Sequence, residues 1–214
     1  MNRCADLAIA DECRLNVLWL HGAGRGDQAL EIEVPSLSLT AGLTALYRQV
    51  DRVPLSALSD TACRGSLPFD TGRFDLVTVY GHCPPRASLA EVRRVLSNNG
   101  TLLLAAGNGW WNGRWRGAAG FFPGRLVNLR VLKSLQATGF GQVSAYWVEP
   151  NLAIPRNLIP VASHRARHFE AIRAREWGGS TLRSLTLNFG LEAFLYPALL
   201  IVARATDSDA VGGA

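Results

Sequence analysis

Short apolar runs, each ended by glycine, proline or polar residues, recur along the whole chain. Such runs are typical of strands buried in a parallel sheet, and we expect strands over residues 17–20, 30–34, 74–80, 101–106, 142–148 and 194–204. Apolar residues at helical spacing lie between these runs. They predict helices over residues 39–50, 126–137 and 164–177, with one more helix that starts at Ser88. The order of strands and helices indicates an α/β fold.

The clearest unit of this pattern spans residues 74–106. Ser88 and Glu91 are spaced as a capping box at the start of its helix, and Asn-Asn-Gly at 98–100 tolerates the left-handed backbone that ends a helix. The stripe that we expect to be buried consists of Leu89, Val92, Val95 and Leu96. Because a strand, a helix and a second strand in this order form a right-handed parallel crossover, we expect a mostly parallel sheet.

Length and composition favour a single domain. The chain has 214 residues, 48% of them hydrophobic, which is enough for a substantial core. We expect a polar lead-in over residues 1–14, one domain over residues 15–205 and a disordered tail over residues 206–214. No apolar run reaches the roughly 20 residues of a membrane span, and the first residues do not have the layout of a signal peptide. We therefore expect a soluble, cytoplasmic protein.

Charge and cysteine usage narrow the chemistry. The net charge is +5, and Lys133 is the only lysine among 22 basic residues, a bias typical of a GC-rich bacterial genome. The four cysteines have no paired metal spacing and are expected to be reduced thiols; they are Cys4, Cys13, Cys63 and Cys83. Neither a disulfide framework nor a zinc site is indicated.

Three alternating glycines, Gly22, Gly24 and Gly26, follow the first apolar run. Glycine adopts positive φ freely and lets backbone amides approach a ligand, so a glycine loop at the carboxyl end of a strand suggests nucleotide binding. A nicotinamide-binding fold is disfavoured. Its fingerprint needs Gly-x-Gly-x-x-Gly leading into a helix and an acid about 20 residues further on, and neither is present.

Several motifs, in order, resemble class I S-adenosylmethionine-dependent methyltransferases, most closely the branch that methylates small molecules such as quinone precursors. The motifs are the glycine loop, Leu-Pro-Phe at 67–69, Phe-Asp-Leu-Val at 74–77, Glu-Val-Arg-Arg-Val-Leu at 91–96 and Gly-Thr-Leu-Leu-Leu at 100–104. The resemblance covers roughly residues 15–140. It implies a Rossmann-like fold with helices on both faces of the sheet. It also implies S-adenosylmethionine as the cofactor, contacted by Gly22, Gly24, Gly26 and Leu67.

The sequence departs from this family at the cofactor motifs. The family has acids at the end of the first strand, at the end of the second strand and before the Leu-Pro-Phe motif; in our alignment these positions hold Leu20, Val34 and Cys63. None of the three can accept a hydrogen bond as a carboxylate does. The nearby acids that could substitute are Asp27, Glu31 and Glu33. The interval between Gly26 and Leu30 also predicts that the first helix is shortened or missing.

These departures lead to two hypotheses. The first is a degenerate methyltransferase fold that acts as a structural or activating subunit, with a related methyltransferase or a second copy of the chain as its partner and cofactor binding weakened or lost. The alternative is an active S-adenosylmethionine-dependent methyltransferase acting on a small molecule, with its acceptor near Tyr80, His82 and the tryptophans. In that case His82 is the candidate base, although a capping role is favoured, and we assign no catalytic residue.

The remaining features are less specific. Trp110, Trp111 and Trp115 suit an aromatic substrate wall or a partner contact, and ordinary packing suits them equally. His164 and His168 have the spacing of metal ligands on a helix, but no carboxylate motif completes them, so we expect no metal. Nearby arginines are not interleaved with aromatic residues, so we expect a solvated helix face and no nucleic acid; they are Arg165, Arg167, Arg173 and Arg175.

Overall fold

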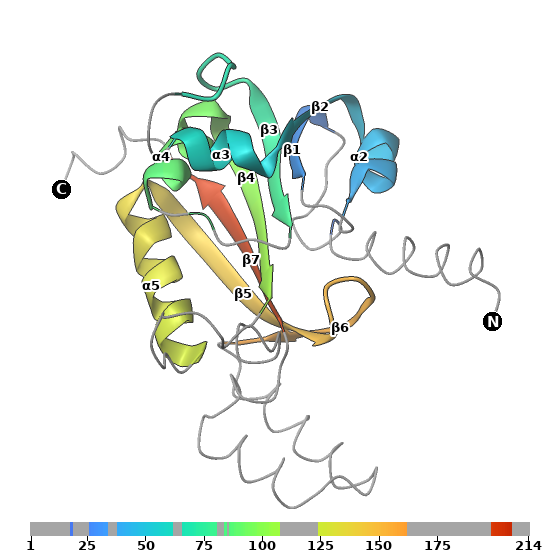
Figure 1. Cartoon of the computed structure of the whole chain (residues 1–214), viewed down its shortest axis with the longest axis vertical. Coiled ribbons are helices and arrows are strands. Elements are labelled where there is room, and N and C mark those ends of the chain that lie inside the picture. Colours follow the sequence, from blue (N-terminus) through green and yellow to red (C-terminus); the bar gives the residue numbers. More distant parts are fainter. Residues whose placement is uncertain are drawn as a thin grey trace, which may run out of the picture.

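The computed structural model describes residues 18, 26–33, 38–61, 66–80, 84, 86–107, 124–161 and 198–206 (Figure 1). The strands are β1 (Gly26–Glu33), β2 (Tyr47–Pro54), β3 (Phe74–Tyr80), β4 (Leu96–Gly107), β5 (Phe140–Pro150), β6 (Pro155–Pro160) and β7 (Ala198–Ala205). The helices are α2 (Thr40–Leu46), α3 (Leu55–Thr61), α4 (Arg86–Val95) and α5 (Gly124–Ala137).

The seven strands form one sheet in the order β2-β1-β3-β4-β7-β5-β6. Strands β1 to β4 pair in parallel, whereas β7 is antiparallel to both β4 and β5, and β6 is antiparallel to β5. The chain leaves β1 toward β2 and leaves β3 toward β4, in opposite directions along the sheet. The order therefore reverses between β1 and β3, which is where open α/β sheets form their ligand crevice.

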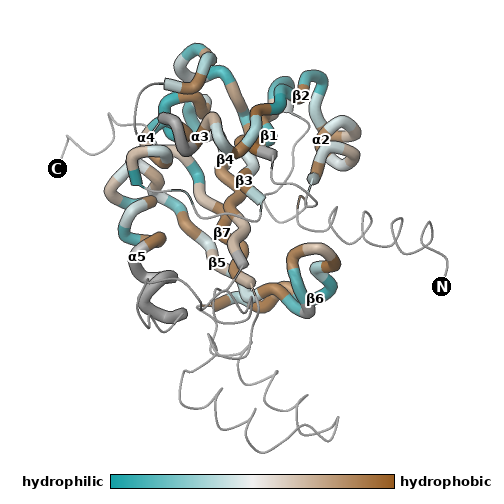
Figure 2. Tube along the Cα trace, viewed as in Figure 1, coloured by the Kyte–Doolittle hydropathy of each residue, from teal (hydrophilic) through white to brown (hydrophobic). Residues whose placement is uncertain are grey.

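Helices cover both faces of this sheet, as predicted. On one face, Leu30 and Ile32 of β1 pack in a core cluster with residues of α3, α4 and α5. On the other face, Ala29 of β1 packs with Leu43 of α2. Figure 2 shows the apolar segments along the central strands, as expected when a sheet is buried on both sides.

The second half of the predicted pattern agrees with the structure. Strand β3 has the predicted bounds, and β4, β5, α5 and β7 overlap the elements predicted over residues 101–106, 142–148, 126–137 and 194–204. Residues 151–154 of the loop predicted over 149–156 form the turn between β5 and β6, while β5 extends to Pro150 and β6, which was not predicted, begins at Pro155. The predicted helix over residues 164–177 lies outside the described residues, as do the lead-in and, apart from Thr206, the tail.

The first half of the pattern needs correction. Leu18 is helical, so the strand predicted over residues 17–20 is wrong there, and β1 begins at Gly26. The segment predicted as one helix over residues 39–50 contains α2 and the first four residues of β2. A run of four apolar residues cannot by itself distinguish a strand from a buried helix. The shortened first helix is present, with seven residues in α2, but it follows β1 and does not precede it.

The predicted capping box is also wrong. Helix α4 begins at Arg86, and the Ser88 hydroxyl donates to the Leu58 carbonyl oxygen (2.8 Å). The Glu91 carboxylate accepts the Leu67 amide (3.1 Å), so neither side chain has its predicted partner. Three residues of the predicted stripe, Leu89, Val92 and Val95, are buried in α4 as expected, and Leu96 is buried as the first residue of β4.

Candidate functional site

The candidate site lies at the carboxyl ends of β1 and β3, where the strand order reverses (Figure 1). The segments that follow these two strands begin with residues 34–37 and 81–83, which lie outside the described residues. The described part of the site consists of the end of β1, the start of α2 and Tyr80.

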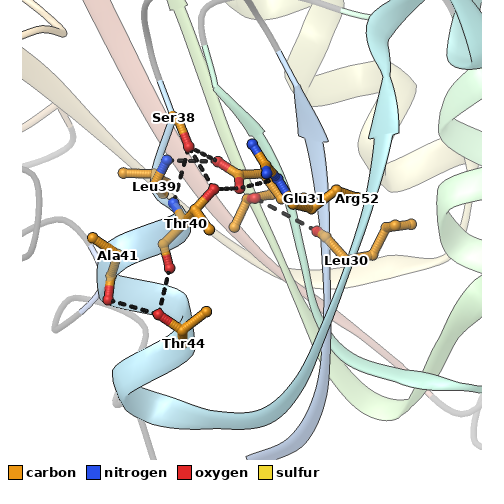
Figure 3. A network of polar contacts seen from close by, with 9 residues as sticks. Leu30, Glu31, Ser38, Leu39, Thr40, Ala41, Thr44 and Arg52 are labelled. Atoms are coloured by element: carbon orange, nitrogen blue, oxygen red, sulfur yellow. Dashed lines mark hydrogen bonds and ion pairs between the residues drawn. The ribbon is translucent and has the colours of Figure 1, made fainter.

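Glu31 is the central polar residue of this region (Figure 3). Its side chain lies on the face of the sheet that carries α2, and the residue is only 2% exposed. One carboxylate oxygen accepts the Ser38 hydroxyl (3.0 Å) and the Leu39 amide (2.5 Å). The other accepts the Thr40 hydroxyl and lies 3.7 Å from Nε of Arg52. Each oxygen of this buried carboxylate thus has two partners.

These contacts join β1 to the beginning of the next helix. Leu39 is the N-cap residue of α2 and has no side-chain cap, so the Glu31 carboxylate takes over the role of accepting a hydrogen bond at this helix end. A carboxylate is also favourable there, because the amino end of a helix carries a partial positive charge. The Thr40 amide also donates to the Ser38 hydroxyl (3.1 Å), and this bond holds the two residues together at the start of α2.

The register of β1 and β2 separates Glu31 from the other acid of this region. Glu31 pairs with Arg52, whereas Asp51 pairs with Leu30 and therefore belongs to the opposite face of the sheet. Asp51 forms an ion pair with Arg73 (2.5 Å), and Nε of Arg73 donates to the Gln28 side chain (2.8 Å). The Asp51 carboxylate is thus paired with Arg73 and lies on the face of the sheet opposite Glu31.

The strand positions change which residues correspond to the family's acids. Leu20 precedes β1 and Val34 follows it, so neither occupies the position that the alignment gave it. Glu31 is the buried acid near the end of the first described strand. The second described strand ends at Pro54, which pairs with Glu33 and offers no acceptor side chain. Cys63, the third position, lies outside the described residues.

The three glycines do not follow the first described strand. Gly26 is the first residue of β1, and Gly22 and Gly24 lie outside the described residues. A Cβ atom at Gly26 would lie only 2.3 Å from Cε1 and 2.8 Å from Cδ1 of Tyr47. The ring of Tyr47 thus packs where a side chain of residue 26 would otherwise be, and this packing alone explains why residue 26 is a glycine. The cofactor contact predicted for these glycines stays a prediction.

Tyr47 provides a test of this packing. Burial, with the Asp75 charge as a second cause, raises the pKa of Tyr47 to about 12. Since the pKa of tyrosine in the unfolded chain is about 10, the stabilising contribution of neutral Tyr47 is complete below pH 10 and is lost as the pH rises toward 12. We expect one tyrosine to titrate near pH 12 in ultraviolet absorbance and to be missing in Tyr47→Phe. A full set of ordinary titrations in the folded protein would contradict this arrangement.

The Leu-Pro-Phe segment at 67–69 is held against the core by α4. Leu67 is 2% exposed, and the Phe69 ring meets the Phe74 ring edge to face with centroids 5.0 Å apart. Glu91 and Arg94 of α4 bind the backbone on both sides of this segment. The structure therefore fixes the loop to which the predicted cofactor residue Leu67 belongs.

The residues predicted near the acceptor are only partly described. Tyr80 ends β3, is buried, and donates a hydrogen bond to the Leu152 carbonyl oxygen (2.8 Å), which ties the candidate site to the turn between β5 and β6. His82 and the tryptophans Trp110, Trp111 and Trp115 lie outside the described part of the chain. So do the residues that were considered for other roles, which are Cys83, His164, His168 and the arginines at 165, 167, 173 and 175.

Among the described residues, no three His, Cys, Asp or Glu side chains come together as a metal site would require. None of the helices in this part of the chain is both long enough and apolar enough to cross a membrane.

Comparison with known proteins defines the fold. No protein-family model and no curated protein matches the sequence. Among solved structures, a possible histamine N-methyltransferase of Thermotoga maritima has a TM-score of 0.53 at 12% identity, with 94% of this chain and 91% of that chain covered. Phosphoethanolamine N-methyltransferase 2 of Haemonchus contortus, solved with S-adenosylmethionine, has a TM-score of 0.51 at 13% identity and 91% coverage of this chain.

This chain spans about half of the Haemonchus enzyme, 52% of its length. A third match is a complex of the Haloferax volcanii Trm112 methyltransferase activator with an inferred methyltransferase (TM-score 0.50, 14% identity, 90% of this chain and 88% of that chain). These likenesses, together with the strand order, show that the chain has the fold of class I S-adenosylmethionine-dependent methyltransferases. The predicted fold is confirmed.

Proposed function

We propose that this protein is an S-adenosylmethionine-dependent methyltransferase that acts on a small molecule. The observation that carries the proposal is Glu31, a buried carboxylate in the first described strand that is hydrogen-bonded to the start of the following helix. The family has an acid at the end of its first strand and a helix behind it. Two of the departures that favoured a non-catalytic subunit, the missing first acid and the missing helix, rested on strand positions that the structure corrects.

The described residues fit the cofactor at the carboxyl end of β1. Glu31 orders this end of the strand through Ser38 and Leu39, and we assign these three residues to the cofactor site. Contacts from Leu67, Gly22 and Gly24 stay predictions. When bound, the cofactor supplies a methyl group already activated on a sulfonium. The protein then has mainly to hold and orient donor and acceptor, and needs a base only where the acceptor must lose a proton.

A non-catalytic subunit is the second candidate, and one observation favours it. The residues from Glu33 to Leu39, which connect β1 to α2, include no glycine, although the family has a glycine loop after its first strand. Strand β2 ends at Pro54, where the family has an acid. Under this candidate the protein binds a related methyltransferase or a second copy of itself. The Haloferax complex is one example of a methyltransferase activator with a partner. We retain a cytoplasmic location as part of both candidates.

Titration calorimetry with S-adenosylmethionine and S-adenosylhomocysteine separates the two candidates. The proposed function predicts saturable binding with a dissociation constant of about 10 µM, which corresponds to a binding free energy of roughly −7 kcal/mol. ATP, which carries adenosine but no methionine, is the control ligand and should give at least tenfold weaker binding. Absence of binding by both ligands at several hundred micromolar would contradict the proposed function. The second candidate would then gain support if a methyltransferase co-purified with the protein or if the protein formed a stable dimer.

A further inference from the structure

The turn between β5 and β6, residues 151–154, lies against the carboxyl end of β3. Tyr80, the last residue of β3, donates its hydroxyl to the Leu152 carbonyl oxygen (2.8 Å). Tyr80 and Leu152 also belong to one core cluster with Leu39, whose amide is bound by Glu31. Figure 1 shows this turn at the end of the sheet toward which the arrowheads of β3 and β4 point. These contacts place the turn beside the candidate site.

Three sets of contacts hold this turn in place. Strands β5 and β6 pair as far as Pro150 and Pro155, which fixes its two ends. The Ile154 amide donates to the side-chain oxygen of Asn151 (3.0 Å) and closes the turn. The Tyr80 hydroxyl holds its middle at Leu152. A turn that is held in this way carries little ordering cost when a ligand contacts it.

The turn presents an uncharged and mostly apolar surface. Its sequence is Asn-Leu-Ala-Ile, with no ionisable side chain. Leu152 is buried, whereas Ala153 and Ile154 are partly exposed. Neither Ala153 nor Ile154 belongs to a core cluster of the described part of the chain. Small-molecule sites are lined mainly by apolar side chains, and these two residues have that character next to the ligand crevice.

We propose that Ala153 and Ile154 form an apolar wall for the methyl acceptor and that Tyr80 is the positioning residue of this wall. The inference rests on the proposed function, which assigns the cofactor to the carboxyl end of β1. Strand β3 is the neighbour of β1 in the sheet, so the turn flanks the crevice on the β3 side. The acceptor must approach the sulfonium methyl from a side that the cofactor leaves open. The acceptor is then a small molecule that presents an uncharged, apolar group beside the atom that receives the methyl.

A cofactor analogue probes this wall without knowledge of the acceptor. The probe is the analogue of S-adenosylmethionine in which a benzyl group replaces the transferable methyl, so that the added ring projects toward the acceptor. Both ligands are sulfonium ions with the same adenosine and amino acid parts. The ratio of their dissociation constants therefore reports the acceptor side alone. We expect the benzyl analogue to bind the wild type at least about tenfold more tightly than S-adenosylmethionine, because the ring loses apolar contact with water.

Ile154→Ser tests the wall, with Val161→Ser as its matched control. Val161 is partly buried, follows the other end of β6 and packs against the core cluster on the opposite face of the sheet from Leu152. We expect the preference for the benzyl analogue to fall about fivefold in Ile154→Ser, because the ring loses an apolar contact. It should be unchanged in Val161→Ser, since a general loss of stability weakens the binding of both ligands alike.

Tyr80→Phe tests the positioning role, with Tyr47→Phe as its control. Both substitutions remove one hydroxyl from the same core cluster, but Tyr47 lies at the start of β2. In Tyr80→Phe, hydrogen exchange of the Ile154 amide should be about fivefold faster, because the turn opens locally, and the preference for the benzyl analogue should fall. Both quantities should keep their wild-type values in Tyr47→Phe.

Each outcome has one meaning. If the wild type binds neither S-adenosylmethionine nor its benzyl analogue, the proposed function fails and the acceptor wall fails with it. If the wild type binds S-adenosylmethionine but does not prefer the analogue, or if Ile154→Ser keeps the preference, the wall is overturned and the proposed function stands. A preference lost in Ile154→Ser but kept in Tyr80→Phe overturns the role of Tyr80 alone. Loss in both variants, with both controls unchanged, supports the whole inference.

Discussion

Replacing Glu31 by alanine should lower the free energy of unfolding by about 3–5 kcal/mol. The carboxylate is buried and accepts hydrogen bonds from the Ser38 hydroxyl, the Leu39 amide and the Thr40 hydroxyl. Its removal takes the acceptor away from the Leu39 amide and from the two hydroxyls, of which one can still donate to the other (2.6 Å), and each buried donor left unsatisfied costs about 1–3 kcal/mol. Because the substitution also leaves a void, the structure has little means of recovering the loss.

Urea denaturation of wild type, Glu31→Gln and Glu31→Ala measures this effect. Glutamine keeps the shape of the side chain but retains only one acceptor oxygen, so we expect Glu31→Gln to lie between the other two proteins. Arg52→Gln is the control, because its side chain is 49% exposed and water can replace the contact with Glu31. We expect it to stay within about 1 kcal/mol of the wild type. A loss below about 1 kcal/mol in Glu31→Ala would show that the network contributes little to stability.

The sequence is most informative where its apolar pattern is unambiguous. Residues 74–80 form a mostly apolar run bounded by Asp70-Thr-Gly-Arg73 and by Gly81, and the strand has the predicted bounds. Helix α4 shows a stripe at helical spacing, so its existence and its buried face were predictable. Its start was not. Ser88 and Glu91 have the spacing of a capping box, but partners far along the chain, at Leu58 and Leu67, bind these side chains instead.

The first strand was misplaced because two signals coincide upstream of it. Residues 17–20 are apolar, and three alternating glycines follow them, which together resemble a strand and a nucleotide loop. The true β1 contains Asp27, Glu31 and Glu33, and this polarity weakens its strand signal. Glu31 is compatible with a buried strand only because it has four partners in the folded chain, and the sequence does not show that the turn after β1 brings three of them back to it; they are Ser38, Leu39, Thr40 and Arg52.

Correcting the strands also changes what the candidate site requires. With β1 at Gly26–Glu33, an acid and a following helix are present where the family has them, while Pro54 stands at the end of β2. Affinity for the cofactor then depends on whether Glu31 suffices without an acid at the carboxyl end of β2, because Asp51, the acid within β2, is paired with Arg73 on the opposite face of the sheet. A charged hydrogen bond contributes about 1.5–3 kcal/mol, so the missing acceptor alone corresponds to about one to two powers of ten in the dissociation constant.

Gly26→Ala should lower the free energy of unfolding by about 1–3 kcal/mol. The new methyl group would lie 2.3 Å from Cε1 of Tyr47, and Oδ2 of Asp75 is also close, at 3.1 Å. Relief is difficult because Tyr47 is buried in the core cluster beside α2, and because Asp75 is engaged by the amides of Asp27 (2.9 Å) and Gln28 (3.2 Å). The strain should therefore be concentrated between Gly26 and the ring of Tyr47.

A double-mutant cycle isolates this contact. In the Tyr47→Ala background the ring is gone, so Gly26→Ala should change the free energy of unfolding by less than about 0.5 kcal/mol, although Tyr47→Ala is itself destabilising. Equal losses in both backgrounds would mean that the ring does not explain the glycine. Calorimetry on the same proteins tests the cofactor role predicted for Gly26. If Gly26 contacts the cofactor, Gly26→Ala should bind S-adenosylmethionine more weakly than the wild type, even at temperatures below the unfolding transition. If Gly26 is purely structural, the affinity of the folded variant should be unchanged.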